Sequence, residues 1–245
     1  MPLTFWSKKA SCRSATRDAI DDDRLVLYAQ PIIPLQGGRL REELLVRLVT
    51  PSGEIVPPGM FLPVAERFGL IADVDRWVVR QAIQRAAEGH RIELNVSAWT
   101  IANVDLLPLV EQQLLATGAD PLDVVFEITE TALMQDLEAG RKFAHGLRGL
   151  GCGLALDDFG TGFASFTYLK TMPFSYLKID IEFVRDLADN PANQHVVDAI
   201  VSLAKGFGQE TIAEGVEDQR ALDILRERGV AFAQGYYLGV PAPLT

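Results

Sequence analysis

The amino-acid sequence predicts an α/β fold, a modified TIM (β/α)8-type barrel with one antiparallel strand. Eight short β-rich runs alternate with helix-like segments through about 220 residues, which favours a barrel over an open, doubly wound sheet. The first two runs are joined by a short turn containing "QGG" instead of a helix, which predicts an antiparallel hairpin. A chain of 245 residues suits one such barrel, and no linker-like or repetitive tract divides it after residue 24.

The strand predictions come from short, mainly apolar runs bounded by polar or turn-forming residues. In chain order these runs cover residues 25–33, 42–48, 91–97, 123–129, 152–158, 176–181, 209–215 and 230–236. The first two are close enough in sequence to pair directly, so we expect one antiparallel pair in the barrel. The later runs are mostly separated by segments long enough for the helical crossovers that parallel strands require.

Helical spacing of apolar residues predicts helices in the segments between the strands. After Asp73, a predicted N-cap, Val74, Trp77 and Val78 recur near helical spacing, and Gly89 can end that helix. Further helices are predicted over residues 106–115, 136–150, 192–206 and 218–228.

The N-terminal residues 1–23 differ in composition from the rest of the chain. They combine scattered Lys and Arg residues with an acidic run at residues 21–23. We expect residues 1–23 to be a leader helix or the remnant of a linker to an upstream segment, and residues 24–245 to form the barrel.

Composition excludes several classes of protein. The 33 Asp and Glu residues outnumber the 23 Lys and Arg residues, and the net charge of −10 disfavours binding to a nucleic-acid duplex. The sequence has neither an apolar run of about 20 residues nor a signal-peptide core, so we expect no transmembrane segment and a cytoplasmic location. Two cysteines, Cys12 and Cys152, are too few for a disulfide framework, and neither is predicted to be a nucleophile.

Charged and amide side chains occur within or at the ends of the apolar strand runs, where a barrel enzyme assembles its site. These residues are Glu43, Asn95, Glu127, Asp157, Asp158, Lys178, Asp180, Glu214 and Gln234. Any one of them could form a salt bridge or a cap, but isolated ionised carboxylates are costly to bury. Successive strands that carry such residues therefore predict one cleft that binds cations.

The donor types in this set predict a hard-oxygen metal site. Carboxylate and amide oxygens suit Mg²⁺ or Mn²⁺ better than Zn²⁺, and the three histidines lie outside the main strand runs. Neighbours on an extended strand point to opposite faces, so Asp157 and Asp158 can both reach a metal pair only where the chain turns. Two divalent ions would make phosphate a favourable ligand, with Lys178 stabilising charge or orienting the attacking hydroxide.

Two other interpretations fit part of the pattern. Gly160, Gly162 and Ser165 approximate a dinucleotide-binding fingerprint, with Asp180 in the place of the ribose acid, but two aspartates directly before the turn would repel a pyrophosphate. A metal-dependent enolising barrel would instead use Lys178 to remove a proton, and spacing alone leaves this interpretation open.

Eight short motifs in a fixed order resemble one known family. The motifs are "QPI" (30–32), "ELLVR" (43–47), "NVS" (95–97), "EITE" (127–130), "DDFGTGF" (157–163), "LKID" (177–180), "AEGVE" (213–217) and "AQGY" (233–236). Over residues 24–241 the chain resembles the EAL-domain family of bacterial cyclic di-GMP phosphodiesterases. The resemblance implies a modified barrel and hydrolysis of cyclic di-GMP to linear pGpG, dependent on Mg²⁺ or Mn²⁺, with two ions per site.

The resemblance also implies roles for individual residues. The implied metal ligands are Glu43, Asn95, Glu127, Asp157, Asp158 and Glu214. Catalytic roles are implied for Lys178, which would contact the attacking water, and for Glu214 and Asp158. Substrate contacts are expected from Gln30, Arg47, Gln234 and Asp180. Support for the site and its loop is expected from Glu130, Gly160, Thr161, Gly162, Ser165 and Glu217.

The sequence departs from the family pattern at Leu44, Phe163, Ala164 and residues 238–241. These departures bear on packing near the metal, on loop control and on a peripheral substrate contact. The alternative function is a catalytically silent EAL domain that binds cyclic di-GMP and signals through a partner or an upstream domain. Receptors of that kind typically lack one or more metal-binding acids, whereas every such acid is present in this sequence. The family also leads us to expect a homodimer and an upstream sensory or diguanylate-cyclase domain.

Overall fold

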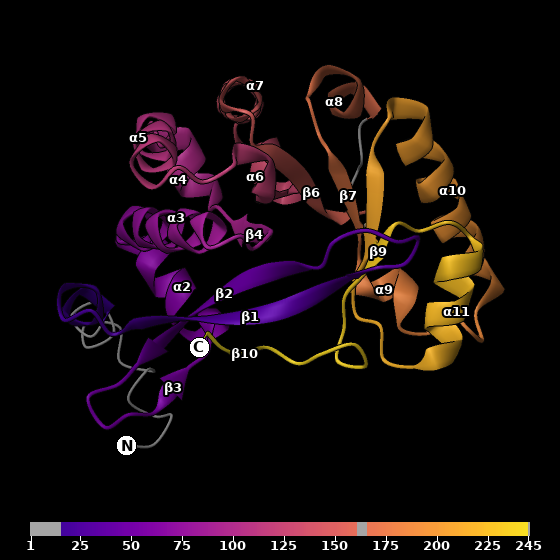
Figure 1. Ribbon diagram of the computed structural model, residues 1–245, viewed down its shortest axis with the longest axis horizontal. Coiled ribbons are helices and arrows are strands. Elements are labelled where there is room, and N and C mark those ends of the chain that lie inside the picture. Colours follow the sequence, from indigo (N-terminus) through magenta and orange to yellow (C-terminus); the bar gives the residue numbers. More distant parts are fainter. Residues whose placement is uncertain (1–15, 161–165, 245) are drawn as a thin grey trace.

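In a computed structural model that describes residues 16–160 and 166–244, the chain forms a closed eight-stranded barrel surrounded by helices (Figure 1). Around the barrel the strands follow the order β1, β2, β4, β5, β6, β7, β8, β9, and pairing of β1 with β9 closes it. Their bounds are β1 Leu25–Pro34, β2 Arg41–Val49, β4 Ile92–Asn95, β5 Val124–Thr129, β6 Gly153–Phe159, β7 Tyr176–Ile179, β8 Glu210–Ala213 and β9 Phe232–Ala233. The predicted modified TIM-type barrel is confirmed.

Strand β1 runs antiparallel to both of its neighbours in the barrel. Its register pairs Gln30 with Glu43 of β2 and Ile33 with Ala233 of β9. The expectation of one antiparallel pair in the barrel was wrong. There are two such pairs, because a single reversed strand in a closed barrel has two neighbours. The other pairings between the barrel strands of the described residues are parallel. Two short strands extend the sheet outside the barrel, β3 (Ile55–Val56) beside β2 and β10 (Ala242–Pro243) beside β1.

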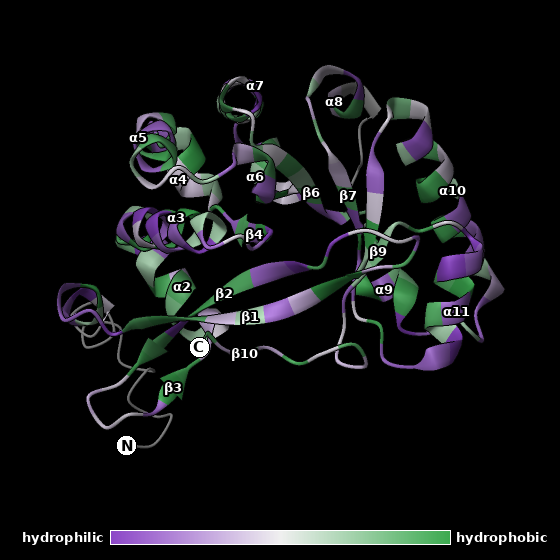
Figure 2. Ribbon diagram, viewed as in Figure 1, coloured by the Kyte–Doolittle hydropathy of each residue, from purple (hydrophilic) through white to green (hydrophobic). Residues whose placement is uncertain are grey.

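Helices cover the outside of the parallel strands (Figure 1). They are α2 Pro58–Arg67, α3 Ile71–Ala87, α4 Ala98–Asn103, α5 Leu107–Thr117, α6 Glu130–Gln135, α7 Leu137–Leu150, α8 Phe166–Thr171, α9 Ile181–Val184, α10 Pro191–Phe207 and α11 Gln219–Glu227. A 3-10 turn, η2, covers Pro121–Asp123. Hydrophobic and hydrophilic residues alternate around helices such as α10 and α11, as expected for helices that pack one face against a barrel (Figure 2).

The helix predicted after Asp73 begins earlier than expected. α3 starts at Ile71 with Leu70 at its N-cap, so Asp73 lies in the first turn, where it pairs with Arg17 and Arg76. An acidic residue favours a helix N-terminus from the first turn as well as from the cap, so the pattern could not separate these positions. Helix α2 was not predicted, because Pro63 in its interior reads as a helix breaker. Helices α4, α6, α8 and α9 were not predicted either, because four to six residues are too few for apolar spacing to identify a helix.

Successive strand residues face alternately outward to the helices and inward to the barrel interior. In β7, Leu177 and Ile179 face outward and are fully buried in the apolar core between barrel and helices, whereas Lys178 faces inward. A second, small apolar cluster includes Ile32 and Phe232 and lies inside the barrel. The polar side chains of the strands therefore point into the barrel interior, next to this small apolar cluster.

The end of the N-terminal segment packs against the barrel. Residues 16–21 are helical, and Ala19 is fully buried in the main apolar core. Arg17 forms an ion pair of 2.9 Å with Asp73 of α3, and Trp77 of the same helix donates a hydrogen bond to Asp23. The assignment of residues 1–23 as a leader or linker stays a prediction.

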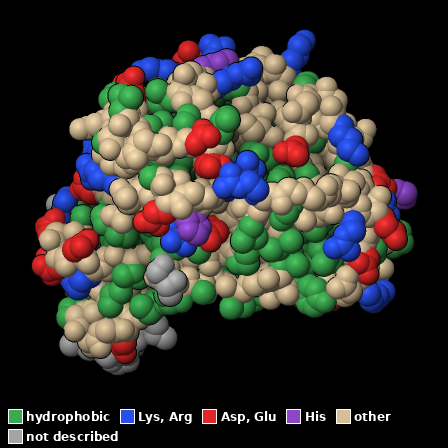
Figure 3. Space-filling view, viewed as in Figure 1, with side chains coloured by type: hydrophobic (Ala, Val, Ile, Leu, Met, Phe, Trp, Pro, Cys, Tyr) green, Lys and Arg blue, Asp and Glu red, His purple; other side chains and the backbone are tan. Residues whose placement is uncertain are grey.

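Two observations on the described residues concern membrane-spanning and duplex-binding proteins, the classes that the composition disfavours. None of their helices combines the length and the apolar character that crossing a membrane requires. On the face of the molecule in Figure 3, acidic and basic side chains are interspersed among hydrophobic ones, with no continuous basic stripe on that face. A duplex-binding surface requires such a stripe to neutralise phosphates.

Candidate functional site

Lys178 lies at the centre of an acidic cluster inside the barrel. Its Nζ is 2.6 Å from Glu127 Oε2, 2.6 Å from Glu214 Oε1, 3.6 Å from Asp157 Oδ1 and 3.8 Å from Glu43 Oε2. Only 1% of the lysine side chain is exposed. The four carboxylates come from β2, β5, β6 and the residue after β8, so closure of the barrel brings together groups that lie far apart in the chain.

A chain of hydrogen bonds orients the Glu43 carboxylate. Asn95 Nδ2 donates to Glu43 Oε1 at 2.8 Å, and Gln234 Nε2 donates to Glu43 Oε2 at 2.6 Å. Gln234 Nε2 also donates to Gln30 Oε1 at 3.0 Å, and Gln30 Nε2 donates to the carbonyl oxygen of Gly239 at 3.0 Å. Gln234 thus holds the Glu43 carboxylate and Gln30 holds Gln234, while the expected substrate contacts of both glutamines stay predictions.

Two departures from the family pattern have structural accounts. Gly239, within the unusual segment 238–241, lies so close to β1 that a Cβ there would be 2.4 Å from the Pro31 ring. Glycine therefore lets this segment approach β1 closely, where its carbonyl oxygen accepts the hydrogen bond from Gln30. Leu44 is buried in the apolar core between the barrel and the helices, so this departure affects packing outside the barrel rather than the acidic cluster.

The side chains of Asp157 and Asp158 both reach the barrel interior because β6 is irregular at this point. The register between β6 and β7 shifts between Leu156 and Phe159, as at a β-bulge. Asp158 has a φ of +56°, a left-handed conformation that aspartate adopts more readily than most residues. We expected the chain to turn at the end of the strand, whereas β6 continues to Phe159 and the change of direction lies within it.

Asp157, Asp158 and Glu214 can share a cation. One oxygen from each lies within 4.8 Å of the others. Burial, followed by the charge of Asp157, raises the pKa of Asp158 to about 6. Asp180 lies beside Asp158 and forms the N-cap of α9, where its side chain accepts a hydrogen bond from the backbone N–H of Glu182 at 2.7 Å. This side of the cluster therefore concentrates negative charge.

The electrostatics of the cluster favour bound protons or cations. Burial raises the pKa of Glu127 well above its usual range, and the charge of Glu43 raises it further. Burial raises the pKa of Glu214 to about 8, although Lys178 acts in the opposite direction. Burial alone would lower the pKa of Lys178, but the neighbouring carboxylates, Asp157 first, hold it well above its usual range. Lys178 therefore stays charged while the acids around it lack sufficient compensating charge.

Arg47 lies four residues after Glu43 in β2, near the end of the strand that is farther from the cluster. Its Nη1 donates to the carbonyl oxygen of Val46 at 3.0 Å, and its guanidinium lies 5.2 Å from the ring centre of Tyr28. Among the residues that the structure describes, no carboxylate forms an ion pair with Arg47. Its charge is therefore available to an anionic ligand, and its substrate-binding role stays a prediction.

The residues expected to support the site differ in their burial and in their contacts. Glu130 is buried, and neither carboxylate oxygen has a hydrogen-bond partner within the described ranges. Gly160 has a φ of +104°, and a Cβ there would lie 2.9 Å from the Phe183 ring, so the position favours glycine. Glu217 is exposed and lies 3.6 Å from Arg185. Outside the described residues are the expected loop residues Thr161, Gly162 and Ser165 and the departures Phe163 and Ala164.

The structure weighs against one of the two other interpretations of the sequence. A dinucleotide-binding fingerprint belongs to an open, doubly wound sheet, whereas this sheet closes into a barrel. The enolising interpretation stays open, because the carboxylates that hold the pKa of Lys178 high are the ones that a bound metal would neutralise. Burial raises the pKa of the Cys152 thiol to about 12, in agreement with the expectation that it is no nucleophile.

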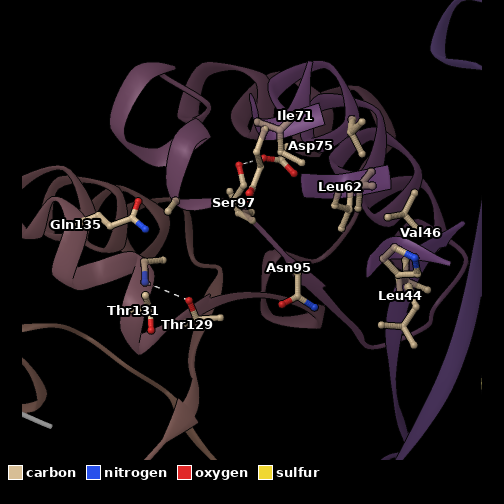
Figure 4. Close-up of a pocket in the computed structure, with 18 residues that line it drawn as sticks. Leu44, Val46, Leu62, Ile71, Asp75, Asn95, Ser97, Thr129, Thr131 and Gln135 are labelled. Atoms are coloured by element: carbon tan, nitrogen blue, oxygen red, sulfur yellow. Dashed lines mark hydrogen bonds between the residues drawn. The ribbon is translucent and has the colours of Figure 1, made fainter. Parts of the chain in front are cut away.

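A pocket of about 440 Å³ adjoins the cluster at Asn95. In Figure 4, Thr131 and Gln135 line one side, Leu44 and Leu62 line the other, and Asn95 lies between them. Aliphatic side chains form most of the wall. The pocket also contains a buried acid that the sequence analysis missed, Asp75 of α3, whose Oδ2 accepts a hydrogen bond from Ser97 Oγ at 2.6 Å. Its position between Val74 and Val78, on the buried face of an amphipathic helix, was the feature that could have identified it.

Replacing Asp75 by asparagine should stabilise the fold at neutral pH. Burial raises the pKa of Asp75 to about 6 from the ordinary value of 3.8, so its contribution to stability is present below pH 4 and is lost as the pH rises through 6. Asparagine keeps an acceptor for Ser97 without the buried charge. We expect a gain of about 1–3 kcal/mol at pH 7 and none near pH 4. Thermal unfolding of both proteins between pH 4 and pH 8 measures this difference, and a pH-independent difference would contradict the prediction.

Comparison with known proteins identifies the family. The family model of the EAL domain matches residues 13–241. The chain is 38% identical to cyclic di-GMP phosphodiesterase PdeB of Shewanella oneidensis over an alignment of 250 residues. This alignment covers 99% of this chain and 29% of PdeB. It is 35% identical over 235 residues to the bifunctional diguanylate cyclase/cyclic di-GMP phosphodiesterase MucR of Pseudomonas aeruginosa, covering 93% of this chain and 34% of MucR. The chain thus spans about a third of the length of the curated relatives it matches.

Solved structures agree with this assignment. The MucR phosphodiesterase in complex with c-di-GMP matches with a TM-score of 0.88 and 34% identity, over 95% of this chain and 97% of that one. The EAL domain of FimX from Pseudomonas aeruginosa, bound to c-di-GMP, matches with a TM-score of 0.90 and 30% identity, over 94% of this chain and 96% of that one. The chain belongs to the EAL domain family.

Proposed function

We propose that this protein hydrolyses one phosphodiester bond of cyclic di-GMP to give linear pGpG, with the help of two Mg²⁺ or Mn²⁺ ions. The observation that supports this function best is the cluster of carboxylates around Lys178 at the carboxyl ends of barrel strands, where Glu43 and Glu214 line a pocket of about 320 Å³. PdeB, MucR and FimX, whose names or structures refer to cyclic di-GMP, support the choice of substrate.

The residues of the cluster fit a pair of divalent cations. Their donors are hard oxygen atoms, the ligands that Mg²⁺ and Mn²⁺ prefer. Glu127 Oε1 is buried and has no hydrogen-bond partner among the described residues, as a vacant ligand atom would be. The five acids of the cluster exceed its one ammonium by four formal charges, which two divalent ions would balance. These acids are Glu43, Glu127, Asp157, Asp158 and Glu214.

Metal ions bound here would activate water and stabilise negative charge on the scissile phosphate. Glu43, held at both oxygens, would keep a fixed ligand geometry, with Glu127, Asn95 and the bulge aspartates completing the ligand set. Lys178 would orient the attacking water and stabilise developing charge. Glu214, beside Lys178 at 2.6 Å, would serve as a ligand or accept a proton.

The pocket of about 440 Å³ suits one base of the substrate. Its aliphatic walls can enclose a flat ring, and the Asp75 carboxylate can accept hydrogen bonds from the N–H groups on the Watson–Crick edge of guanine. Arg47, which makes no ion pair within the described ranges, would bind a phosphate. These assignments predict a preference for a guanine dinucleotide, and the Asp75→Asn protein should bind cyclic di-GMP more weakly although it is more stable.

The direct test is incubation of the purified protein with cyclic di-GMP in Mg²⁺ or Mn²⁺, followed by chromatographic separation of the nucleotides. We expect pGpG in the presence of metal, none in a chelator control, and much slower turnover of cyclic di-AMP. Tight binding of cyclic di-GMP without pGpG would instead establish a silent receptor. An upstream regulatory domain and a homodimer belong to the same proposal; the first is supported by MucR, which is bifunctional and about three times as long.

A further inference from the structure

A buried ion pair lies inside the barrel, one layer of side chains below the acidic cluster. Arg41 Nη1 is 3.2 Å from Glu93 Oε1, and the two residues are 2% and 0% exposed. Arg41 Nη2 donates a hydrogen bond of 2.6 Å to Tyr176 Oη, and the guanidinium carbon lies 4.6 Å from the ring centre of Tyr176. We refer to Arg41, Glu93 and Tyr176 as the interior clamp.

Charged groups are uncommon in this position. Barrel interiors are filled mainly by branched apolar side chains, and Ile32 and Ile212 beside the clamp follow that rule. A buried Arg–Glu pair gives little net stability, because the cost of removing both charges from water offsets their attraction. Arg41 Nε and Glu93 Oε2 also lack hydrogen-bond partners among the described residues. A contribution to stability therefore does not explain why the ion pair is present. Its position beneath the acidic cluster suggests a role in positioning that cluster.

Each clamp residue lies two positions before a residue of the cluster on the same strand. The pairs are Arg41 and Glu43 in β2, Glu93 and Asn95 in β4, and Tyr176 and Lys178 in β7. Residues two apart on a strand face the same side and are separated by about 7 Å. The clamp thus ties three strands together across the barrel interior, one step from the atoms that would bind metal and water.

The clamp also lies next to the cluster in the register of the barrel strands. In the register of β4 and β5, Glu93 pairs with Val125, two positions before Glu127, whose Oε2 is 2.6 Å from Lys178 Nζ. A change in the position of Arg41 would therefore be passed through Glu93 to a residue of the proposed metal site.

We propose that the interior clamp positions the metal site: Arg41 is a positioning residue that sets the spacing of β2, β4 and β7 and thereby the affinity of the site for a divalent cation. The inference rests on the proposed function in one respect, namely that the cluster binds such a cation.

The test removes the ion pair as a unit. The double variant Arg41→Met/Glu93→Leu loses one positive and one negative charge, so the net charge beneath the site is unchanged, and apolar side chains fill the space. The Mn²⁺ dissociation constant of the whole chain is measured without substrate, by electron paramagnetic resonance or calorimetry, alongside thermal unfolding in chelator. We expect a melting temperature close to that of the wild type and a dissociation constant about 10-fold higher. An unchanged dissociation constant would overturn the proposal.

Two further variants complete the experiment. Tyr176→Phe removes only the hydroxyl that accepts from Arg41, and it should also raise the Mn²⁺ dissociation constant; an unchanged constant overturns the proposal even if the double variant fails to fold. Arg220→Gln/Asp189→Asn removes an ion pair of 2.7 Å whose side chains are 65% and 78% exposed, and it should leave the constant unchanged. Failure of the wild type to bind Mn²⁺ would overturn the proposed function as well, whereas equal binding by wild type and clamp variants would overturn this inference alone.

Discussion

Replacing Glu43 by alanine is expected to lower kcat/KM for cyclic di-GMP by a factor on the order of 10³ or more, while the protein remains folded. Glu43 faces the barrel interior, and both of its oxygens are held by amide donors, from Asn95 at 2.8 Å and from Gln234 at 2.6 Å. Alanine removes a proposed metal ligand that this arrangement orients. Asp157→Ala should have an effect of the same order, because it removes a second proposed metal ligand, whose Oδ1 is 3.6 Å from Lys178 Nζ.

The matched control for Glu43 is its neighbour Glu42. The Glu42 side chain points to the other face of β2, where it lies 3.6 Å from Arg85 and 3.3 Å from His90. Glu42→Ala should therefore retain activity close to that of the wild type. Steady-state kinetics with Mg²⁺ and with Mn²⁺, together with circular dichroism to check folding, compare the three proteins. Full activity of Glu43→Ala would refute its assignment as a metal ligand.

Replacing Lys178 by alanine is expected to lower kcat by about 10²–10³-fold with a much smaller change in KM. Nζ lies among four carboxylates and is almost fully buried, so it is placed to act on water and developing charge rather than on the bases of the substrate. In the absence of metal, the variant also leaves these carboxylates without their ammonium partner, which should destabilise the fold. Divalent metal should therefore raise the melting temperature of Lys178→Ala more than that of the wild type.

Single-turnover kinetics and substrate binding separate the two possible effects of Lys178→Ala. A fall in the chemical rate with near-normal affinity is the expected result. A loss confined to substrate affinity would show that the water-orienting role is wrong. Lys170→Ala, at an exposed position on α8, is the control for loss of a lysine, and it should change neither quantity.

Much of the fold could be predicted because it depends on local pattern. The residues 177–179 of β7 alternate between apolar side chains that face the helices and a lysine that faces the interior, and this period of two is visible without a structure. The short connection after β1 likewise predicts the reversed strand, because a parallel crossover needs a longer segment. The short helices and the start of α3 were missed, since neither depends on an extended apolar pattern, and α2 was missed because it contains a proline, Pro63.

The sequence by itself determined the class of barrel, the family and the set of acids that end the strands, because motif order and apolar periodicity are properties of neighbouring residues. Only the tertiary structure decided how those acids meet around Lys178, how a bulge with a left-handed Asp158 brings two adjacent aspartates to one site, and that Asp75 enters the pocket. It alone revealed the pairing of Arg41 with Glu93, which are 52 residues apart. Such contacts depend on closure of the barrel, on strand register and on side-chain orientation, and the distance between two residues along the chain does not specify any of these.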